Sequence, residues 1–120
     1  MRYDGSNIFA RILRGEIPNK TVAEDEFTLA FEDINPARAV HVLVIPKGQY
    51  VDWLDFSANA TAEEQAAFTR MIAHVAEITG IAKNGFRVIS NIGANGHQEV
   101  PHLHMHVIGG EPVGRMLSSS

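Results

Sequence analysis

The residues best suited to chemistry are three histidines that alternate with apolar residues near the C-terminal end of the chain. They are His102, His104 and His106, with Leu103 and Met105 between them. Because successive side chains of a β-strand point to opposite faces, a strand here places the three imidazoles in one row and the apolar residues toward the core. Every buried ring nitrogen needs a hydrogen-bond partner, so packing alone does not favour such a row. The pattern predicts a functional site.

Two chemistries use a row of this kind. Several imidazoles can converge on a divalent metal such as zinc, and His41, in another apolar run, could add a ligand. Alternatively, one neutral imidazole attacks phosphorus while its neighbours orient it and bind the phosphate oxygens. Spacing does not decide between the two, although the preceding loop favours an oxyanion. Residues 92–101 combine glycines with the polar pair Gln98 and Glu99, which offer backbone amides and polar side chains.

Composition limits the class of protein. With 120 residues, 45% hydrophobic and 20% charged, the chain has the size and composition of one globular domain. The net charge of −4 argues against a nucleic acid polymer as partner, since that binding requires clustered Lys and Arg. Cysteine is absent, which excludes disulfides and thiolate metal sites. The apolar runs are too short for a membrane span or a signal peptide, so we expect a cytoplasmic protein without membrane contact.

The first half of the chain predicts a helix followed by strands. Residues 8–13 have helical spacing after a possible cap at Ser6 or Asn7. Residues 21–23 and 27–32 read as a hairpin, and residues 40–45 as a central strand.

The second half predicts another helix and two more strands. Thr61 and Glu64 form a capping box ahead of the apolar stripe of Phe68, Met71, Ile72 and Val75, and His74 lies on the solvent face. Strands are expected at 86–91 and 102–108. The order helix, strands, helix, strands predicts an α+β fold with an antiparallel sheet.

Residues 102–108, followed by Gly109 and Gly110, resemble the signature of the histidine triad (HIT) superfamily in its HINT branch. The segments 8–18, 30–36, 41–46 and 98–100 also look like HINT segments, in the same order. The resemblance implies a single HIT domain over residues 1–120. In that fold a five-stranded antiparallel sheet carries two helices, and the sheets of two subunits join across a homodimer.

The same resemblance implies a purine nucleoside phosphoramidase. Such an enzyme binds a purine nucleotide, AMP or GMP, and hydrolyses the P–N bond of its phosphoramidates, such as AMP-lysine, through a nucleotidyl-histidine intermediate. It needs neither metal nor cofactor. The alternatives are a purine nucleotide-binding or scaffold protein without catalysis, and another HIT-type hydrolase or transferase. A zinc hydrolase built on the four histidines ranks last.

Site residues follow by position from the resemblance. His104 is the nucleophile, His106 contacts the phosphate, and His102 and His41 support and orient. Asp33 receives the ribose hydroxyls, although it could simply cap a turn. Four apolar residues surround the base, with core packing as the alternative: Phe9, Ile17, Phe31 and Ile34. Asn91, Gln98 and Glu99 lie near the phosphate, and Val100 is a further nucleotide-binding residue.

Two residues depart from the family pattern near the phosphate. Glu99 stands where many members have serine, and a carboxylate beside a phosphate is repulsive unless it is protonated or turned away. His97 stands where glycine is common. A protonated His97 would partly offset the charge of Glu99, and otherwise it is an exposed loop residue.

Overall fold

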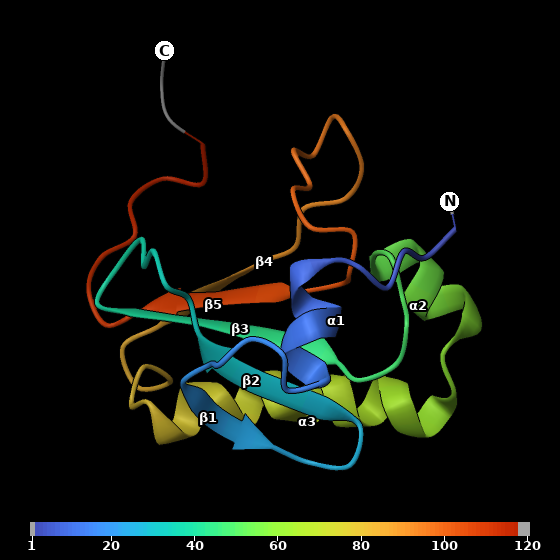
Figure 1. Cartoon of the computed structure of the whole chain (residues 1–120). Helices are drawn as coiled ribbons and strands as arrows, with labels where there is room; N and C mark the ends of the chain where they lie inside the picture. The colour runs from blue at the N-terminus through green and yellow to red at the C-terminus, as the bar shows by residue number, and fades with distance from the viewer. Residues whose placement is uncertain (1, 118–120) are drawn as a thin grey trace.

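A computed structural model describes residues 2–117 of the chain (Figure 1). Over this range its elements are, in order, α1 (Ile8–Leu13), β1 (Thr21–Glu24), β2 (Thr28–Glu32), β3 (Val40–Pro46), α2 (Trp53–Asn59), α3 (Ala62–Ile78), β4 (Phe86–Ile89) and β5 (Met105–Gly109). The strands pair antiparallel in the order β1-β2-β3-β5-β4. The predicted α+β fold with a five-stranded antiparallel sheet is therefore confirmed. The Ser118–Ser120 tail lies outside the described residues.

Local signals place most of these elements where the sequence predicts them. The side chain of Asn7 caps α1 by accepting from the Ala10 N–H at 2.9 Å. The β1–β2 hairpin forms, and β3 is the central strand. At α3, Thr61 and Glu64 make the reciprocal bonds of the predicted capping box.

The structure adds a short helix, α2, that the sequence analysis did not predict. Asp52 caps it by accepting from the Asp55 N–H, and Phe56 is its buried residue. One buried residue in a seven-residue helix leaves no repeat for a periodicity argument to detect. The segment becomes a helix because Phe56 packs against Tyr50 and Phe68.

Helices α1 and α3 cover opposite faces of the sheet (Figure 1). Alternate residues of β3 point to the two faces, as strand geometry requires. Val42 and Val44 pack on the side of α3, whereas Leu43 and Ile45 pack on the side of α1. His41 has the same parity as Leu43, so its side chain lies on the α1 face.

The two C-terminal strands are shorter than predicted. β4 ends at Ile89 instead of 91, and β5 begins at Met105 instead of 102. The cause is a turn before β5, where the His102 N–H donates to the Val100 carbonyl and the Leu103 N–H to the Tyr50 carbonyl. These bonds take the backbone of 102–104 out of the sheet ladder. Leu103 is nevertheless buried on the α3 side, as expected.

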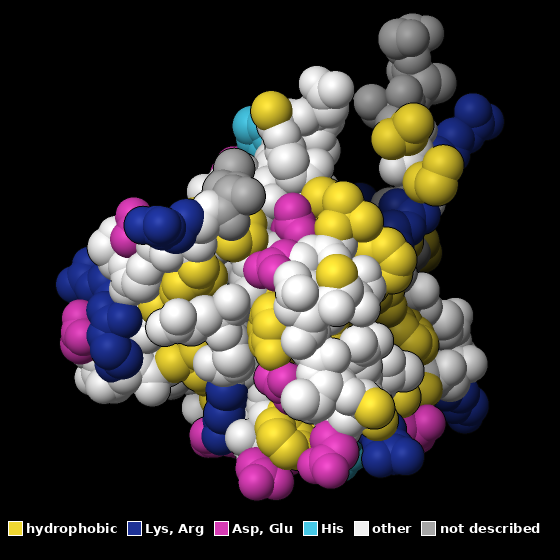
Figure 2. Space-filling model, turned by 90° about the vertical axis from the view of Figure 1, so that its right-hand side faces the viewer, with side chains coloured by type: hydrophobic (Ala, Val, Ile, Leu, Met, Phe, Trp, Pro, Cys, Tyr) yellow, Lys and Arg dark blue, Asp and Glu magenta, His cyan; other side chains and the backbone are white. Residues whose placement is uncertain are grey.

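The described surface has mixed charge. On the face shown in Figure 2, Lys and Arg side chains lie toward the edges, and Asp and Glu also occupy the middle. That face offers no continuous basic patch to a polyanion. None of the helices within residues 2–117 combines the length and apolarity needed to cross a bilayer. The cytoplasmic location stays a prediction.

Candidate functional site

The structure brings four histidines together on the α1 face of the sheet. His41, His102 and His104 are buried, and His106 is half-buried. The ring of His106 lies between those of His41 and His104, with ring centroids 5.1 and 5.2 Å away. Phe9 of α1 covers His104, its ring 4.9 Å away. The predicted row exists, although a turn rather than a strand positions its first two members.

The protonation of His104 follows from its backbone partner. Its Nδ1 lies 2.8 Å from the carbonyl oxygen of His102. A carbonyl only accepts, so Nδ1 must carry the proton, and a neutral ring then has its lone pair on Nε2. Burial lowers the pKa of His104, although the charges of Asp33 and Glu99 partly oppose this shift. The ring is therefore neutral near pH 7 and presents the nitrogen that nucleophilic attack requires.

His102 is held at both ring nitrogens. Nε2 lies 2.8 Å from the Pro46 carbonyl and must donate to it. Nδ1 therefore accepts, and its donor is the Tyr3 hydroxyl at 2.6 Å. Burial lowers the pKa of His102 to about 4. The sequence analysis missed Tyr3 and Pro46, because their contacts with His102 join distant parts of the chain and leave no local pattern.

His41 and His106 form a second pair, in which the nitrogen that carries the proton can also be assigned on each ring. The Ala37 N–H donates to Nδ1 of His41, so the proton of neutral His41 is on Nε2. That Nε2 lies 2.8 Å from Nδ1 of His106 and 3.3 Å from the carboxylate of Asp33. His106 accepts at Nδ1 and carries its own proton on Nε2. Among the described residues this buried N–H has no partner, so it is free to donate to a ligand.

The protonation of these ring nitrogens is poorly suited to binding a metal ion. Side-chain ligand atoms of Asp33, His41 and His106 lie within 4.8 Å of one another, which would suit a cation by distance. However, Nδ1 of His41 accepts from a backbone N–H, so a metal on Nε2 would require an imidazolate or the loss of that bond. Both nitrogens of His102 are also occupied. The donor set fits hydrogen bonding to an anion better than metal ligation.

Asp33 lies directly after β2, where the chain turns toward His41. Its Oδ1 accepts from the Asn35 N–H at 2.8 Å, so the turn-capping interpretation is correct for this oxygen. The other oxygen lies beside His41. One carboxylate thus stabilises the turn and also extends the polar edge of the histidine row.

The apolar residues assigned to nucleotide binding divide into two groups. Phe9 and Phe31 are buried and in edge contact, 5.7 Å between centroids, and Ile17 and Val100 pack against their cluster. Core packing is therefore a sufficient role for these four. Ile34 differs, because 88% of its surface is exposed in the turn after Asp33.

Gln98 secures the loop between β4 and the histidine row. Its amide nitrogen donates to the Val51 and Val100 carbonyls, at 2.7 and 3.0 Å, and its oxygen accepts from the Gly93 N–H. The loop itself occupies this amide, which the sequence analysis expected near a phosphate. Asn91 is half-buried at the start of the loop.

The carboxylate of Glu99 pairs with His97 at the exposed end of the same loop. Its oxygen lies 3.1 Å from Nε2 of His97, and both side chains are largely exposed. His97 has a φ of 59°, in the left-handed region that glycine occupies without strain. This conformation gives a physical reason for the glycine that the resemblance implies at the position.

Comparisons with known proteins identify the family of this chain. The HIT domain family model matches residues 14–113, which include the four histidines and leave Tyr3 outside. An uncharacterised HIT-like protein of Azospirillum brasilense is 55% identical over 116 residues, covering 97% of this chain and 95% of its own. A purine nucleoside phosphoramidase of Escherichia coli K12 is 44% identical over 114 residues, covering 92% of each chain. A solved HIT family hydrolase from Clostridium thermocellum is 38% identical, with a TM-score of 0.85 over 93% of this chain and 97% of its own.

Proposed function

The chain belongs to the HIT family, and we propose that it is a purine nucleoside phosphoramidase in which His104 is the nucleophile. One observation carries the proposal. The bond from Nδ1 of His104 to the His102 carbonyl leaves a lone pair on Nε2, within a row of neutral imidazoles. The Escherichia coli relative supports the choice of substrate.

The reaction proceeds by two displacements at the α-phosphorus of a nucleoside phosphoramidate. In the first, Nε2 of His104 forms a bond to phosphorus as the P–N bond breaks, and the amine leaves with the electron pair and takes up a proton from water. The ring of His104 keeps its proton on Nδ1 and becomes cationic. In the second, water attacks phosphorus and gives up a proton to the solvent, the bond to His104 breaks with its electron pair returning to Nε2, and the nucleoside monophosphate is released. The free Nε2–H of His106 donates to a phosphate oxygen as negative charge develops. Neither step requires a metal or a cofactor.

Binding of the nucleotide uses the edge of the site formed by the turn after β2. We assign the ribose hydroxyls to Asp33 and the exposed face of the base to Ile34, with Phe9, Ile17, Phe31 and Val100 as the supporting wall. The phosphate then lies toward His106 and the loop of Asn91, Gln98 and Glu99.

The resemblance also leads us to propose a homodimer, joined through β4. This strand is one edge of the sheet, and its Phe86 and Val88 are 39% and 41% exposed. Pairing two such edges would extend the sheet and cover both side chains.

Covalent trapping tests the proposed function. Rapid quenching of the protein with an adenosine phosphoramidate, followed by mass spectrometry, should show an added nucleotidyl mass on the peptide that contains His104. His104→Asn should abolish turnover and the adduct while AMP still binds, because the rest of the pocket remains. His74→Asn is the matched control at an exposed histidine on α3 and should behave like the wild type.

Three outcomes would contradict the proposal. Turnover by His104→Asn near the wild-type rate would exclude His104 as the nucleophile. AMP binding without any turnover by the wild type would favour the scaffold alternative. Loss of wild-type activity on EDTA treatment, together with stoichiometric zinc, would instead support a metal hydrolase.

A further inference from the structure

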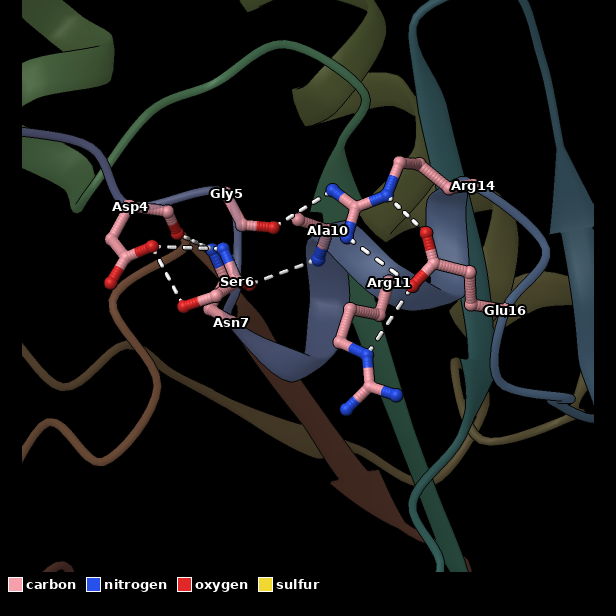
Figure 3. A network of polar contacts seen from close by, with 8 residues as sticks. All are labelled: Asp4, Gly5, Ser6, Asn7, Ala10, Arg11, Arg14 and Glu16. Carbon is pink, nitrogen blue, oxygen red and sulfur yellow. Dashed lines mark hydrogen bonds and ion pairs between the residues drawn. The ribbon is translucent and has the colours of Figure 1, made fainter.

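A segment outside the family match reaches the histidine row. Residues 2–7, here called the N-terminal arm, precede α1 and are fastened to it (Figure 3). The Asn7 amide donates to the Asp4 carbonyl, and Arg14 donates to the Gly5 carbonyl, both at 2.8 Å. Arg14 is itself held by Glu16 at 2.6 Å. The arm therefore has a defined position relative to the first helix.

Tyr3 of this arm contacts His102 in two ways. Its hydroxyl donates to Nδ1 of His102 at 2.6 Å, and the two rings meet edge to face with centroids 5.5 Å apart. His102 has 0% exposure, and the Pro46 carbonyl already occupies its other nitrogen. A buried lone pair left without a donor is unfavourable, so the Tyr3 hydroxyl completes the hydrogen bonding of this ring.

The backbone of His102 transmits this constraint to His104. The carbonyl that accepts from Nδ1 of His104 belongs to the same residue whose ring Tyr3 and Pro46 hold. Phe9 packs against both imidazole rings, with centroids 6.3 Å from His102 and 4.9 Å from His104. The ring and the carbonyl of His102 are thus fixed together, and the carbonyl sets both the tautomer and the direction of His104.

We propose that Tyr3 is a positioning residue for the nucleophile, acting on His104 through His102. The inference rests on the proposed function and adds to it a group from outside the family match. The hydrogen bond and the ring contact of Tyr3 are both made to His102, so its removal should slow the displacement at phosphorus and leave nucleotide binding unchanged. Near-attack geometry is sensitive to small displacements, so loss of one supporting bond is expected to have a measurable effect.

The two tyrosines of the chain provide a matched pair of variants. Tyr3→Phe removes only the hydroxyl that reaches His102. Tyr50→Phe removes a hydroxyl that donates to Glu64 at 2.8 Å, in contact with the core on the α3 side. With an adenosine phosphoramidate as substrate, Tyr3→Phe should lower kcat roughly 5- to 50-fold with KM within about twofold. Tyr50→Phe should keep both constants, and each variant should lower the melting temperature because each loses one hydrogen bond.

An NMR measurement tests the same inference without relying on activity. In ¹⁵N spectra of the imidazoles, Tyr3→Phe should shift Nδ1 of His102 and also the Nδ1–H of His104, whereas Tyr50→Phe should move neither. An unchanged His104 signal in Tyr3→Phe would overturn the positioning role, even if the wild type proved inactive and the proposed function failed. With an active wild type, an unchanged kcat for Tyr3→Phe, or an equal loss for Tyr50→Phe, would overturn the role and leave the proposed function intact.

Discussion

At the scale of single residues, backbone groups rather than side chains determine which ring nitrogens of the site carry a proton. The carbonyls of Pro46 and His102 can only accept, and the N–H of Ala37 can only donate. These three groups determine which nitrogen carries the proton on His102, His104 and His41. Within residues 2–117, two groups are left without a partner by these bonds, the lone pair on Nε2 of His104 and the Nε2–H of His106.

The role of Asp33 can be separated from its structural role by an isosteric change. Asp33→Asn keeps an oxygen that can accept from the Asn35 N–H but removes the charge beside His41. Hydrogen bonds to a charged group contribute about 1–3 kcal/mol, so we expect AMP binding to weaken by that amount. Isothermal titration with AMP and 2′-deoxy-AMP measures it. Equal affinities of the wild type for the two nucleotides would show that Asp33 does not bind the ribose.

At the scale of elements, the loop of residues 92–101 depends on one side chain. Removing the Gln98 amide leaves the Gly93 N–H and the carbonyls of Val51 and Val100 without the partners it provides. Gln98→Ala should therefore speed hydrogen exchange across residues 92–101 and lower kcat several-fold, with a stability loss of roughly 1–2 kcal/mol. Hydrogen-exchange mass spectrometry and kinetics follow these changes.

Gln65→Ala is the matched control for that loop variant. The Gln65 amide also donates to backbone carbonyls, those of Ser57 and Ala60, but between α2 and α3. It should increase exchange near its own site and leave kcat unchanged. Similar exchange in the loop for wild type and Gln98→Ala would show that other contacts hold the loop.

Elements with strong local signals were predictable from the sequence. The capping box at Thr61, the hairpin before β3 and the alternation around Leu103 are read from neighbouring residues. The start of β5 was not, because distant backbone groups compete for its first residues. The four histidines of the site were named from the sequence, but neither the Tyr3 contact nor the use of Gln98 by its own loop could be. Both depend on which groups the fold brings together.

At the scale of the whole molecule, the fold buries imidazoles in their neutral form, and this must be reflected in its stability. Burial lowers the pKa of His102 and of His106 from the ordinary 6.5 to about 4. Between pH 6.5 and about pH 4, these two histidines bind protons in the unfolded chain but stay neutral in the folded chain. The contribution of these two neutral histidines to stability is therefore fully present above about pH 6.5. It is lost progressively as the pH is lowered toward 4.

Urea denaturation at pH 7 and at pH 5 measures this linkage. For His102 alone the free energy of unfolding should fall by about 2 kcal/mol between the two pH values. His102→Gln removes the titrating group, so this variant should start less stable at pH 7 but lose correspondingly less on acidification. His74→Gln, at an exposed position of α3, should show the wild-type decrease. If His102→Gln and the wild type lost the same free energy between pH 7 and pH 5, proton uptake by His102 could not be the cause, and other titrating groups would have to account for the acid sensitivity.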